Sequence, residues 1–307
     1  MHHSLRAWAW TLSLILSCCG GESSPSNSTE DGPAGESSEL SIHGMSFNVR
    51  YGLAPDGENS WAYRKEDVIE VIDSRQPDFV GIQEAWLFQM VDIEEGLQGY
   101  SYLGRPRSTD ESLGEATPIL YQNERWQLDH TQHGTFWLSD TPEVPGSMSW
   151  GNTLPRIATW ARLIHQKSKR GIYVFNTHLD HESWNARING ANLIKERVTQ
   201  RLHPEPVIVT GDFNAGESSD VLGAFLSGPS PLVDTYRVIH PHSINAGTFH
   251  GFTGEDTGSR IDYVLVEPGA EVTGASIIKD HQDGRYPSDH FPVDATLLYA
   301  PSAPVTP

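Results

Sequence analysis

The chain has 307 residues, of which 20% are charged and 37% are hydrophobic, a composition typical of globular proteins and unlike that of disordered or fibrous ones. Its 40 Asp and Glu residues outnumber its 21 Lys and Arg residues, and the formal charge of −19 disfavours a protein that binds duplex nucleic acid on a positive surface. Both cysteines, Cys18 and Cys19, lie near the N-terminus, which excludes a disulfide framework, a cysteine-ligated zinc site and a thiol nucleophile from the rest of the chain.

The N-terminal segment has the features of an export signal. Arg6 precedes an apolar stretch, residues 7–17, which suits the core of a signal peptide and is too short to span a bilayer. The stretch ends in Ile15-Leu16-Ser17-Cys18, which resembles the lipobox of bacterial lipoproteins. We therefore expect a lipoprotein signal peptide at residues 1–17, a lipid on Cys18, and an exported protein anchored by that lipid to a bacterial membrane. An ordinary secretory signal with incidental cysteines is the alternative.

The remaining chain divides by composition into a linker, one domain and a tail. Residues 18–39 are mostly small, polar or acidic and cannot bury enough apolar surface to fold, so they predict a flexible acidic linker. Residues 40–300 contain no second linker, repeat or low-complexity run, and they predict a single domain that carries most of the negative charge. Residues 301–307 predict a disordered tail.

In chain order, alternating or continuous apolar runs predict β-strands at residues 42–49, 78–83, 117–122, 157–165, 172–179, 206–213, 261–266 and 291–299. Apolar residues at helical spacing predict helices at 61–75 and 184–202, which end before Pro77 and Pro204. Because the helices are spaced irregularly among the strands, we expect two packed sheets flanked by helices and not a regular βαβ alternation.

Polar side chains gather where the predicted strands begin or end, and such loops commonly display catalytic groups. They are Asn48, Glu84, His178, Asp212, Asn214, Asp262, Asp289 and His290. The carboxylates of Glu84, Asp212 and Asp289, with the amide oxygen of Asn48, are hard oxygen ligands that suit Mg²⁺ or Mn²⁺ better than zinc. The two histidines add proton transfer near neutral pH.

Six short motifs carry these residues and occur in the order of one known group of enzymes. They are FNV, IQE, NTHL, GDFN, RIDYV and SDHFPV, spread over residues 46–293. Together they resemble the endonuclease/exonuclease/phosphatase superfamily, and strings such as SWAYRKEDV and DGRYPSDHFPV resemble its bacterial secreted branch. The resemblance implies a four-layer α/β sandwich, in which two packed, mostly antiparallel β-sheets are flanked by helices, and the metal-dependent hydrolysis of phosphate esters.

The resemblance also implies roles for the polar residues. Glu84 is implied as the principal metal ligand, with Asn48 beside it and Asp289 on the same metal or on a second one. Asp212 resembles the residue that accepts a proton from water, and Asn214 resembles the amide that donates to a phosphoryl oxygen.

Two histidines complete the implied catalytic set. His290 and Asp262 resemble a pair in which the carboxylate fixes the tautomer of the imidazole, and either His290 or Asp212 accepts the proton. His178 resembles the histidine that contacts the phosphate and protonates the leaving oxygen. Glu115 is a candidate partner for His178, and a surface glutamate in a loop is the alternative.

Three arginines are candidates for substrate binding, because a guanidinium binds phosphate through paired hydrogen bonds. They are Arg50, Arg156 and Arg187, and ordinary surface arginines are the alternative. Three histidines in residues 240–250 could form a metal cluster, but a solvated loop is the favoured interpretation.

The sequence therefore predicts a lipid-anchored, monomeric phosphoesterase that uses Mg²⁺ or Mn²⁺ and water to hydrolyse a phosphate ester. A small phosphoester is the favoured substrate because no loop is rich in Lys and Arg, and the densest basic stretch is residues 165–171. A secreted nuclease acting on DNA or RNA is the first alternative. A catalytically silent binding lipoprotein is the alternative of another class, disfavoured because every implied catalytic position is filled.

Overall fold

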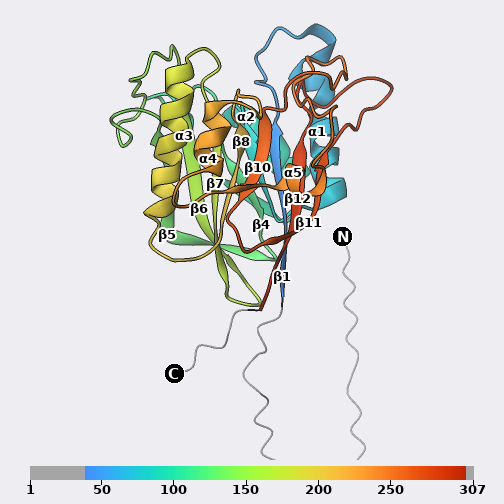
Figure 1. Ribbon diagram of the computed structural model, residues 1–307. Coiled ribbons are helices and arrows are strands. Elements are labelled where there is room, and N and C mark those ends of the chain that lie inside the picture. Colours follow the sequence, from blue (N-terminus) through green and yellow to red (C-terminus); the bar gives the residue numbers. More distant parts are fainter. Residues whose placement is uncertain (1–38, 302–307) are drawn as a thin grey trace, which may run out of the picture. The chain divides into compact units, whose positions relative to one another are not determined.

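Two six-stranded β-sheets packed face to face form the centre of the computed structural model, which describes residues 39–301 (Figure 1). The expected signal peptide at residues 1–17, the lipidation site Cys18, the linker up to residue 38 and the tail from residue 302 lie outside the described residues. The predicted domain, residues 40–300, falls within them.

Each sheet contains one parallel pair of strands, β1–β2 or β7–β8, and is antiparallel elsewhere. The first sheet has the spatial order β11 (Glu271–Ile277), β12 (Val293–Tyr299), β1 (Leu40–Asn48), β2 (Phe79–Gln83), β4 (Ile119–Gln122) and β3 (Tyr100–Leu103). The second has the order β5 (Trp126–Trp137), β6 (Ile157–His165), β7 (Gly171–His178), β8 (Val207–Asp212), β10 (Asp262–Val266) and β9 (Val233–Asp234).

Helices cover the outer face of each sheet, which gives the four layers that were expected. The helices are η1 (Gly57–Asn59), α1 (Trp61–Arg75), α2 (Leu87–Gly96), α3 (Trp184–Thr199), α4 (Asp220–Leu226) and α5 (Thr235–Ile239). Buried residues of α1 and α2 pack on β1 and β2, whereas those of α3 and α4 pack on β7, β8 and β10 (Figure 1). The prediction of a mostly antiparallel α/β sandwich is therefore confirmed.

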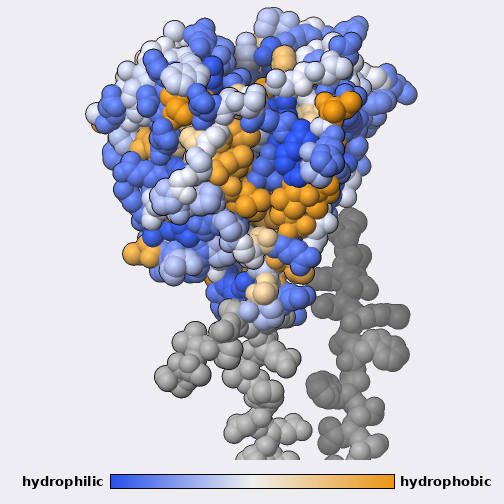
Figure 2. Space-filling view, viewed as in Figure 1, coloured by the Kyte–Doolittle hydropathy of each residue, from blue (hydrophilic) through white to orange (hydrophobic). Residues whose placement is uncertain are grey.

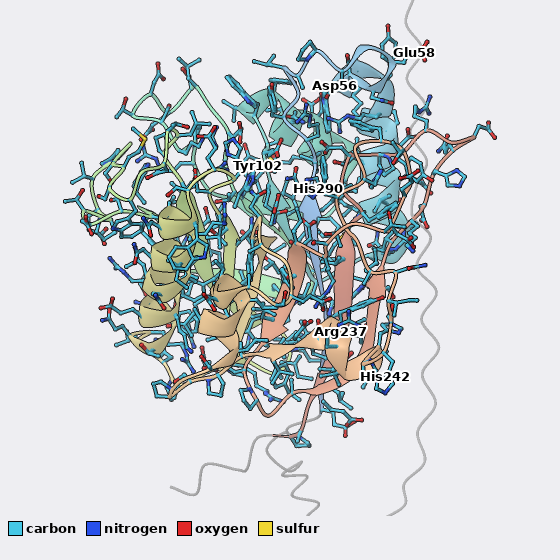
Figure 3. The ribbon with its side chains drawn as sticks, turned by 45° about the horizontal axis from the view of Figure 1, so that its top comes forward. Asp56, Glu58, Tyr102, Arg237, His242 and His290 are labelled. Carbon is cyan, nitrogen blue, oxygen red and sulfur yellow. The ribbon has the colours of Figure 1, made fainter. Side chains whose placement is uncertain are left out.

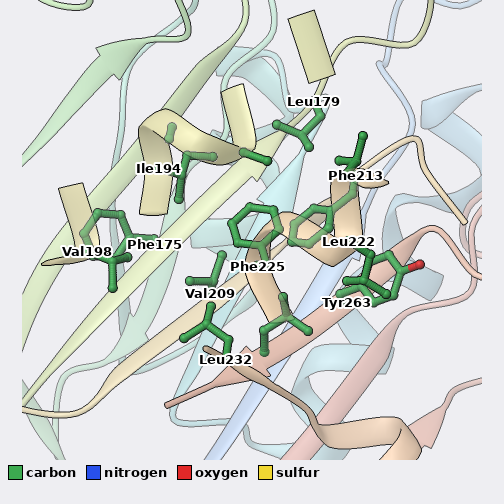
Figure 4. Close-up of a cluster of buried hydrophobic side chains, with 14 of the residues drawn as sticks. Phe175, Leu179, Ile194, Val198, Val209, Phe213, Leu222, Phe225, Leu232 and Tyr263 are labelled. Carbon is green, nitrogen blue, oxygen red and sulfur yellow. The ribbon is translucent and has the colours of Figure 1, made fainter. Parts of the chain in front are cut away.

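Apolar side chains on both faces of the central strands explain why their sequences read as continuous apolar runs. In β8, Val207 and Val209 belong to the core beneath α3 and α4, and Ile208 belongs to the core between the sheets. The outer core includes Phe225 of α4, whose ring lies beside that of Phe213 (Figure 4). Each central strand is thus held by apolar packing on two sides.

A polar network joins the two sheets below the end of the sandwich where the polar motifs lie. Gln83 Nε2 of β2 donates to Asn176 Oδ1 of β7 at 2.7 Å, and Asn176 Nδ2 donates to the Ile82 carbonyl at 2.7 Å. Thr210 of β8 donates to Asn176 Oδ1 at 3.1 Å. Gly81 faces this network, where a Cβ atom would overlap Thr210 Oγ1 and Asn176 Oδ1. The absence of a side chain at Gly81 therefore allows the sheets to approach.

The predicted strands and helices correspond to observed ones, but edge strands and short helices escape the sequence patterns. The elements missed are β3, β5, β9, β11, η1, α2, α4 and α5. The strand β5 is an edge strand with largely half-exposed or exposed residues on both faces, so its sequence lacks an apolar alternation. The same holds for β11, at the edge of the other sheet.

The surface of the described part is mainly hydrophilic on the face shown in Figure 2, and apolar side chains gather there over the region of α4, α5 and β12. Within residues 39–301, no helix combines the length and apolar character that crossing a bilayer requires.

We expect Gly81→Ala to lower the free energy of unfolding by roughly 1–3 kcal/mol, because an added methyl must displace the buried network between the sheets. Gly223→Ala is the matched control: no atom lies within 4 Å of its added Cβ, and alanine in a helix is more stable than glycine by about 0.5–1 kcal/mol. Urea unfolding of both variants checks the difference in sign. Equal stability of the two variants would contradict the close approach at Gly81.

Candidate active site

The polar residues predicted at strand ends meet at one end of the sandwich. Asn48 ends β1 and Glu84 follows β2 in the first sheet, whereas His178 and Asp212 end the adjacent strands β7 and β8 of the second. Figure 3, which brings this end forward, shows His290 close to the middle of the end. The parallel pairs β1–β2 and β7–β8 explain the convergence, because their carboxyl ends lie on the same side of each sheet.

Asn48 lies between two carboxylates at the centre of the site. Its Nδ2 donates to Glu84 Oε1 and to Asp212 Oδ2, both at 3.0 Å. Its Oδ1 accepts a hydrogen bond from the backbone N–H of Arg50 at 2.9 Å. The amide oxygen is thus held by the backbone and the amide N–H groups bridge the carboxylates, and the metal contact expected of Asn48 stays a prediction.

Three site residues other than glycine have left-handed backbones, a conformation that is uncommon for them and that concentrates at functional sites. Their φ angles are 57° at Arg50, 62° at Glu84 and 47° at Asn214. Glu84 directly follows the last residue of β2, whereas Arg50 and Asn214 lie two residues after the last residues of β1 and β8. The sharp change of direction turns these side chains toward the centre of the site, and backbone N–H groups then fix them, as Tyr51 N does by donating to Glu84 Oε2 at 2.9 Å.

Asp212 and Asn214 are fixed by the buried aromatic residue between them. Phe213 is fully buried, and its ring lies 4.7 Å from that of Phe225 and 4.9 Å from that of Tyr263, measured between centroids (Figure 4). Asn214 N donates to Asp212 Oδ1 at 2.9 Å, which closes a tight turn. The GDFN motif thus anchors its polar residues through packing of its phenylalanine.

His290 and Asp262 form the expected pair. His290 Nδ1 lies 2.9 Å from Asp262 Oδ2, and its Nε2 lies 3.7 Å from Asp212 Oδ2. Burial opposes a charge on the imidazole, but Asp262 and Asp212 outweigh it and raise the pKa of His290. Burial, together with the charge of Asp262, raises the pKa of Asp212. The neighbouring carboxylates thus favour a protonated imidazole at His290.

His178 has a different environment from the one expected. Its Nε2 lies 3.0 Å from Asn214 Nδ2 and 3.4 Å from Asp212 Oδ2. Burial lowers the pKa of His178 well below its ordinary value, and the charges of Arg156 and Arg107 lower it further. This environment favours a neutral imidazole in the free protein, and the expected role of His178 as the acid for the leaving oxygen stays a prediction.

Glu115 does not pair with His178, which corrects the predicted pairing. Its Oε1 accepts a hydrogen bond from Arg107 Nη2 at 2.8 Å. Burial raises the pKa of Glu115, and Arg107 partly offsets this effect. No local signal in the sequence distinguishes Arg107, which lies in an irregular loop eight residues before its partner and reaches the site only through the fold.

Asp289 lies beside Arg50 in the site. Arg50 Nε is 3.6 Å from Asp289 Oδ2 and donates to Asp56 Oδ2 at 3.0 Å. The hydrogen bond to Asp56 raises the pKa of Arg50. Burial raises the pKa of Asp289, and the charges of His290 and Arg50 oppose this rise.

The donor set fits a hard divalent cation. Ligand atoms of Glu84, His178 and Asp212 lie within 4.8 Å of one another, and a second such group contains Asp212, Asp262 and His290. Carboxylate oxygens predominate in both groups, as Mg²⁺ and Mn²⁺ require, and a cation would balance the charges of the buried carboxylates Asp212 and Asp289. Glu84 would hold the cation, and Asp289 lines the same cavity.

A cavity of about 420 Å³ opens over this cluster. Its wall includes the expected residues Arg50, Glu115 and Arg156, together with Arg107 and the apolar Phe249. The expected substrate residue Arg187 is not among the residues that line the cavity; its Nη1 donates to the backbone carbonyl of Asp180 at 2.9 Å. The structure therefore gives Arg187 a structural contact in place of the predicted substrate contact.

The histidines of residues 240–250 do not gather into a metal site. His240 Nε2 lies 2.8 Å from the Ala275 carbonyl, whereas His250 stacks on Phe291 at 3.9 Å between ring centroids. Figure 3 shows His242 near Arg237, far from His290. Among residues 39–301, the groups that could hold a metal include none of the three histidines.

Solved structures of similar proteins cover most of the chain. An endonuclease/exonuclease/phosphatase family protein from Bacteroides thetaiotaomicron is 32% identical and has a TM-score of 0.79, with 85% of this chain and 96% of that chain covered. A mannosyl-6-phosphatase from the same species is 32% identical and has a TM-score of 0.77, with 84% of this chain and 100% of that chain covered.

Curated relatives are more distant and longer. Nocturnin of Drosophila melanogaster is 25% identical over 288 residues, which make up 80% of this chain and 43% of nocturnin. An uncharacterised protein of Acanthamoeba polyphaga mimivirus is 27% identical over 165 residues, which make up 51% of this chain and 60% of that protein. The chain thus spans about half the length of the curated relatives it matches.

A sequence model described as the Endonuclease/Exonuclease/phosphatase family matches residues 45–290. The matched range contains the site residues from Asn48 to His290 and most of both sheets. The chain therefore belongs to the endonuclease/exonuclease/phosphatase family.

Proposed function

We propose that this protein is a divalent-metal-dependent phosphoesterase that hydrolyses small phosphate esters, with sugar phosphates as the favoured class, and that it acts as a monomer. The observation that carries the proposal is the cavity of about 420 Å³ above the acidic cluster, a volume in the range of small-molecule sites. The similarity to a mannosyl-6-phosphatase supports the same class of substrate.

Alternating donors and acceptors on the cavity wall suit a polar leaving group. Arg156 Nη2 lies 2.7 Å from His181 Nδ1, Arg107 donates to Glu115, and all four side chains line the cavity. Guanidinium and carboxylate groups together can bind several hydroxyls of one sugar. Phe249 adds an exposed aromatic surface beside them.

The site residues have separate roles in the proposed reaction. When bound at Glu84, Mg²⁺ or Mn²⁺ supplies a Lewis acid that balances the charge of the phosphate. Asp212 accepts the proton of the attacking water, because its Oδ2 lies at the centre of the cluster, 3.0 Å from Asn48 Nδ2. Asn214, His178 and His290 direct nitrogen atoms to the same region and stabilise the charge on the phosphoryl oxygens.

A nuclease is the second candidate, favoured by the similarity to nocturnin and to a Ccr4 exoribonuclease subunit of Schizosaccharomyces pombe. Against it stand the formal charge of −19 and the pairing of the cavity arginines with carboxylates, such as Arg50 with Asp56 and Arg107 with Glu115. These pairs leave little positive field for a long polyanion.

We expect Glu84→Gln to lower kcat/KM on the order of 100-fold or more at limiting Mg²⁺, because it removes the anionic ligand while keeping the side-chain volume, and loss of even an outer-shell metal partner costs roughly 10–100-fold. Glu95→Gln, at an exposed position of α2, is the matched control and should leave activity and metal dependence unchanged. Circular dichroism verifies that both variants fold. Near-normal turnover of Glu84→Gln at limiting Mg²⁺ would exclude this metal site.

A salt titration of kcat/KM distinguishes the two candidate functions. For a sugar phosphate at saturating Mg²⁺ we expect little change between low and moderate salt, because the substrate is bound by local contacts in the cavity. The panel includes single-stranded DNA, duplex DNA and RNA, each with an EDTA control. Strong cleavage of nucleic acid that falls steeply with added salt would support the nuclease in place of the small-substrate enzyme.

We also propose that Cys18 carries a lipid and anchors the exported protein to a bacterial membrane, which rests on the lipobox-like Ile15-Leu16-Ser17-Cys18 alone. Cys18→Ser should move the protein to the soluble fraction, because the lipid would be its hydrophobic anchor, whereas Cys19→Ser should leave it in the membrane fraction. Fractionation with immunoblotting measures both variants. Membrane retention of Cys18→Ser with unchanged processing would refute lipidation at that position.

A further inference from the structure

Arg64 is a fully buried arginine whose bonding differs from that of the other arginines near the site. It lies in the first turns of α1, in the SWAYRKEDV string, and its relative exposure is 0%. Burial lowers the pKa of Arg64 to about 10. Within residues 39–301, no carboxylate lies within salt-bridge distance of its guanidinium, whereas Arg50 pairs with Asp56 and Arg107 pairs with Glu115.

The guanidinium of Arg64 donates to four backbone carbonyls in place of a carboxylate. Its Nη1 donates to Val49 O at 2.6 Å and to Pro287 O at 2.9 Å. Its Nη2 donates to Arg50 O at 3.0 Å, and its Nε donates to Asn59 O at 2.9 Å.

Three of these contacts join the segments that carry the proposed metal-binding residues. Val49 and Arg50 directly follow Asn48 at the end of β1, and Pro287 lies two residues before Asp289. Ser288 makes a second link between the same segments, because its Oγ donates to Asn48 O at 2.7 Å. The segments are 240 residues apart in sequence at this contact, so no local turn can fix their separation.

Two aromatic rings lie beside the guanidinium of Arg64. Its central carbon lies 5.1 Å from the ring centroid of Trp61 and 5.8 Å from that of Phe252. Such contacts favour a planar cation and restrict its rotation. The orientation of the four donated hydrogen bonds is therefore set by packing and not by a charged partner.

We propose that Arg64 is a positioning residue for the metal site: by joining the carbonyls at residues 49, 50 and 287, it sets the distance between the Asn48 side and the Asp289 side of the acidic cluster. Arg64 touches neither the proposed cation nor the substrate, and the inference rests on the metal-dependent function proposed above. Lysine cannot replace it, because one ammonium nitrogen has three donors and cannot reach both segments in the geometry of a planar fork.

The test is calorimetric titration of Mn²⁺ into the full-length protein after EDTA treatment and dialysis, for wild type, Arg64→Lys and Arg201→Lys. Arg201 is the control, since it also donates to two backbone carbonyls, Val198 O of α3 and Glu205 O just before β8, at the end of β8 opposite the site; unlike Arg64, it also pairs with a carboxylate, that of Glu267. We expect Arg64→Lys to weaken Mn²⁺ binding by roughly 10–100-fold, as losses outside the ligand shell do, and Arg201→Lys to bind Mn²⁺ as wild type does. The Mg²⁺ concentration for half-maximal activity should rise in parallel in Arg64→Lys.

Circular dichroism establishes whether Arg64→Lys folds, and Ser288→Ala provides the test if it does not. Loss of the Ser288 hydroxyl should weaken Mn²⁺ binding about threefold or more, because it removes the second link between the same segments. The inference would be overturned if folded Arg64→Lys bound Mn²⁺ with wild-type affinity, or if Arg201→Lys weakened Mn²⁺ binding equally. If Arg64→Lys does not fold, wild-type Mn²⁺ affinity in Ser288→Ala would overturn it. A wild-type protein that binds no Mn²⁺ would overturn the metal-dependent function itself, and the inference with it.

Discussion

The close approach of the two sheets at Gly81 is the constraint on which the site depends. Glu84 and Asn48 belong to the first sheet, whereas His178 and Asp212 belong to the second, so the distances among them are distances between sheets. The network of Asn176, Gln83 and Thr210 fixes this separation with buried hydrogen bonds, which are directional where apolar packing is not. A polar layer therefore lies between the apolar core and the catalytic cluster.

The backbone at the strand ends orients the side chains of the site, and residues packed outside the site stabilise that orientation. The left-handed backbones at Glu84 and Asn214 cost free energy, and the structure tolerates them because buried neighbours offset that cost. For Asn214 the neighbour is Phe213, stacked between Phe225 and Tyr263. For Arg50, which also has a left-handed backbone, it is Arg64, which donates to the carbonyls of residues 49 and 50 after β1. The precision of the site thus originates in residues that never meet the substrate.

The sequence predicts this fold well where a strand is buried on both faces and poorly at the sheet edges. β7 and β8 are continuous apolar runs, but β5 carries half-exposed polar residues because it has a neighbour on one side only. Motifs identify Asp212 and His290, yet no pattern predicts that Glu115 pairs with Arg107 and not with His178. Pairings of this kind depend on loops whose course is set by tertiary packing. The sequence therefore predicts which residue types belong to the site, but not which side chains pair with one another.

Charge pairing explains how an acidic chain can bind an anionic group. Arg50, Arg107 and Arg156 each lie beside a carboxylate, so at a distance their charges cancel and the negative field of the whole chain dominates. At contact distance the cancellation is incomplete, because Arg156 Nη1 is buried and has no hydrogen-bond partner among the described residues. For the small phosphate ester proposed above as the substrate, such a pocket would exert its attraction only at contact distance, whereas a long polyanion would first have to approach the acidic surface.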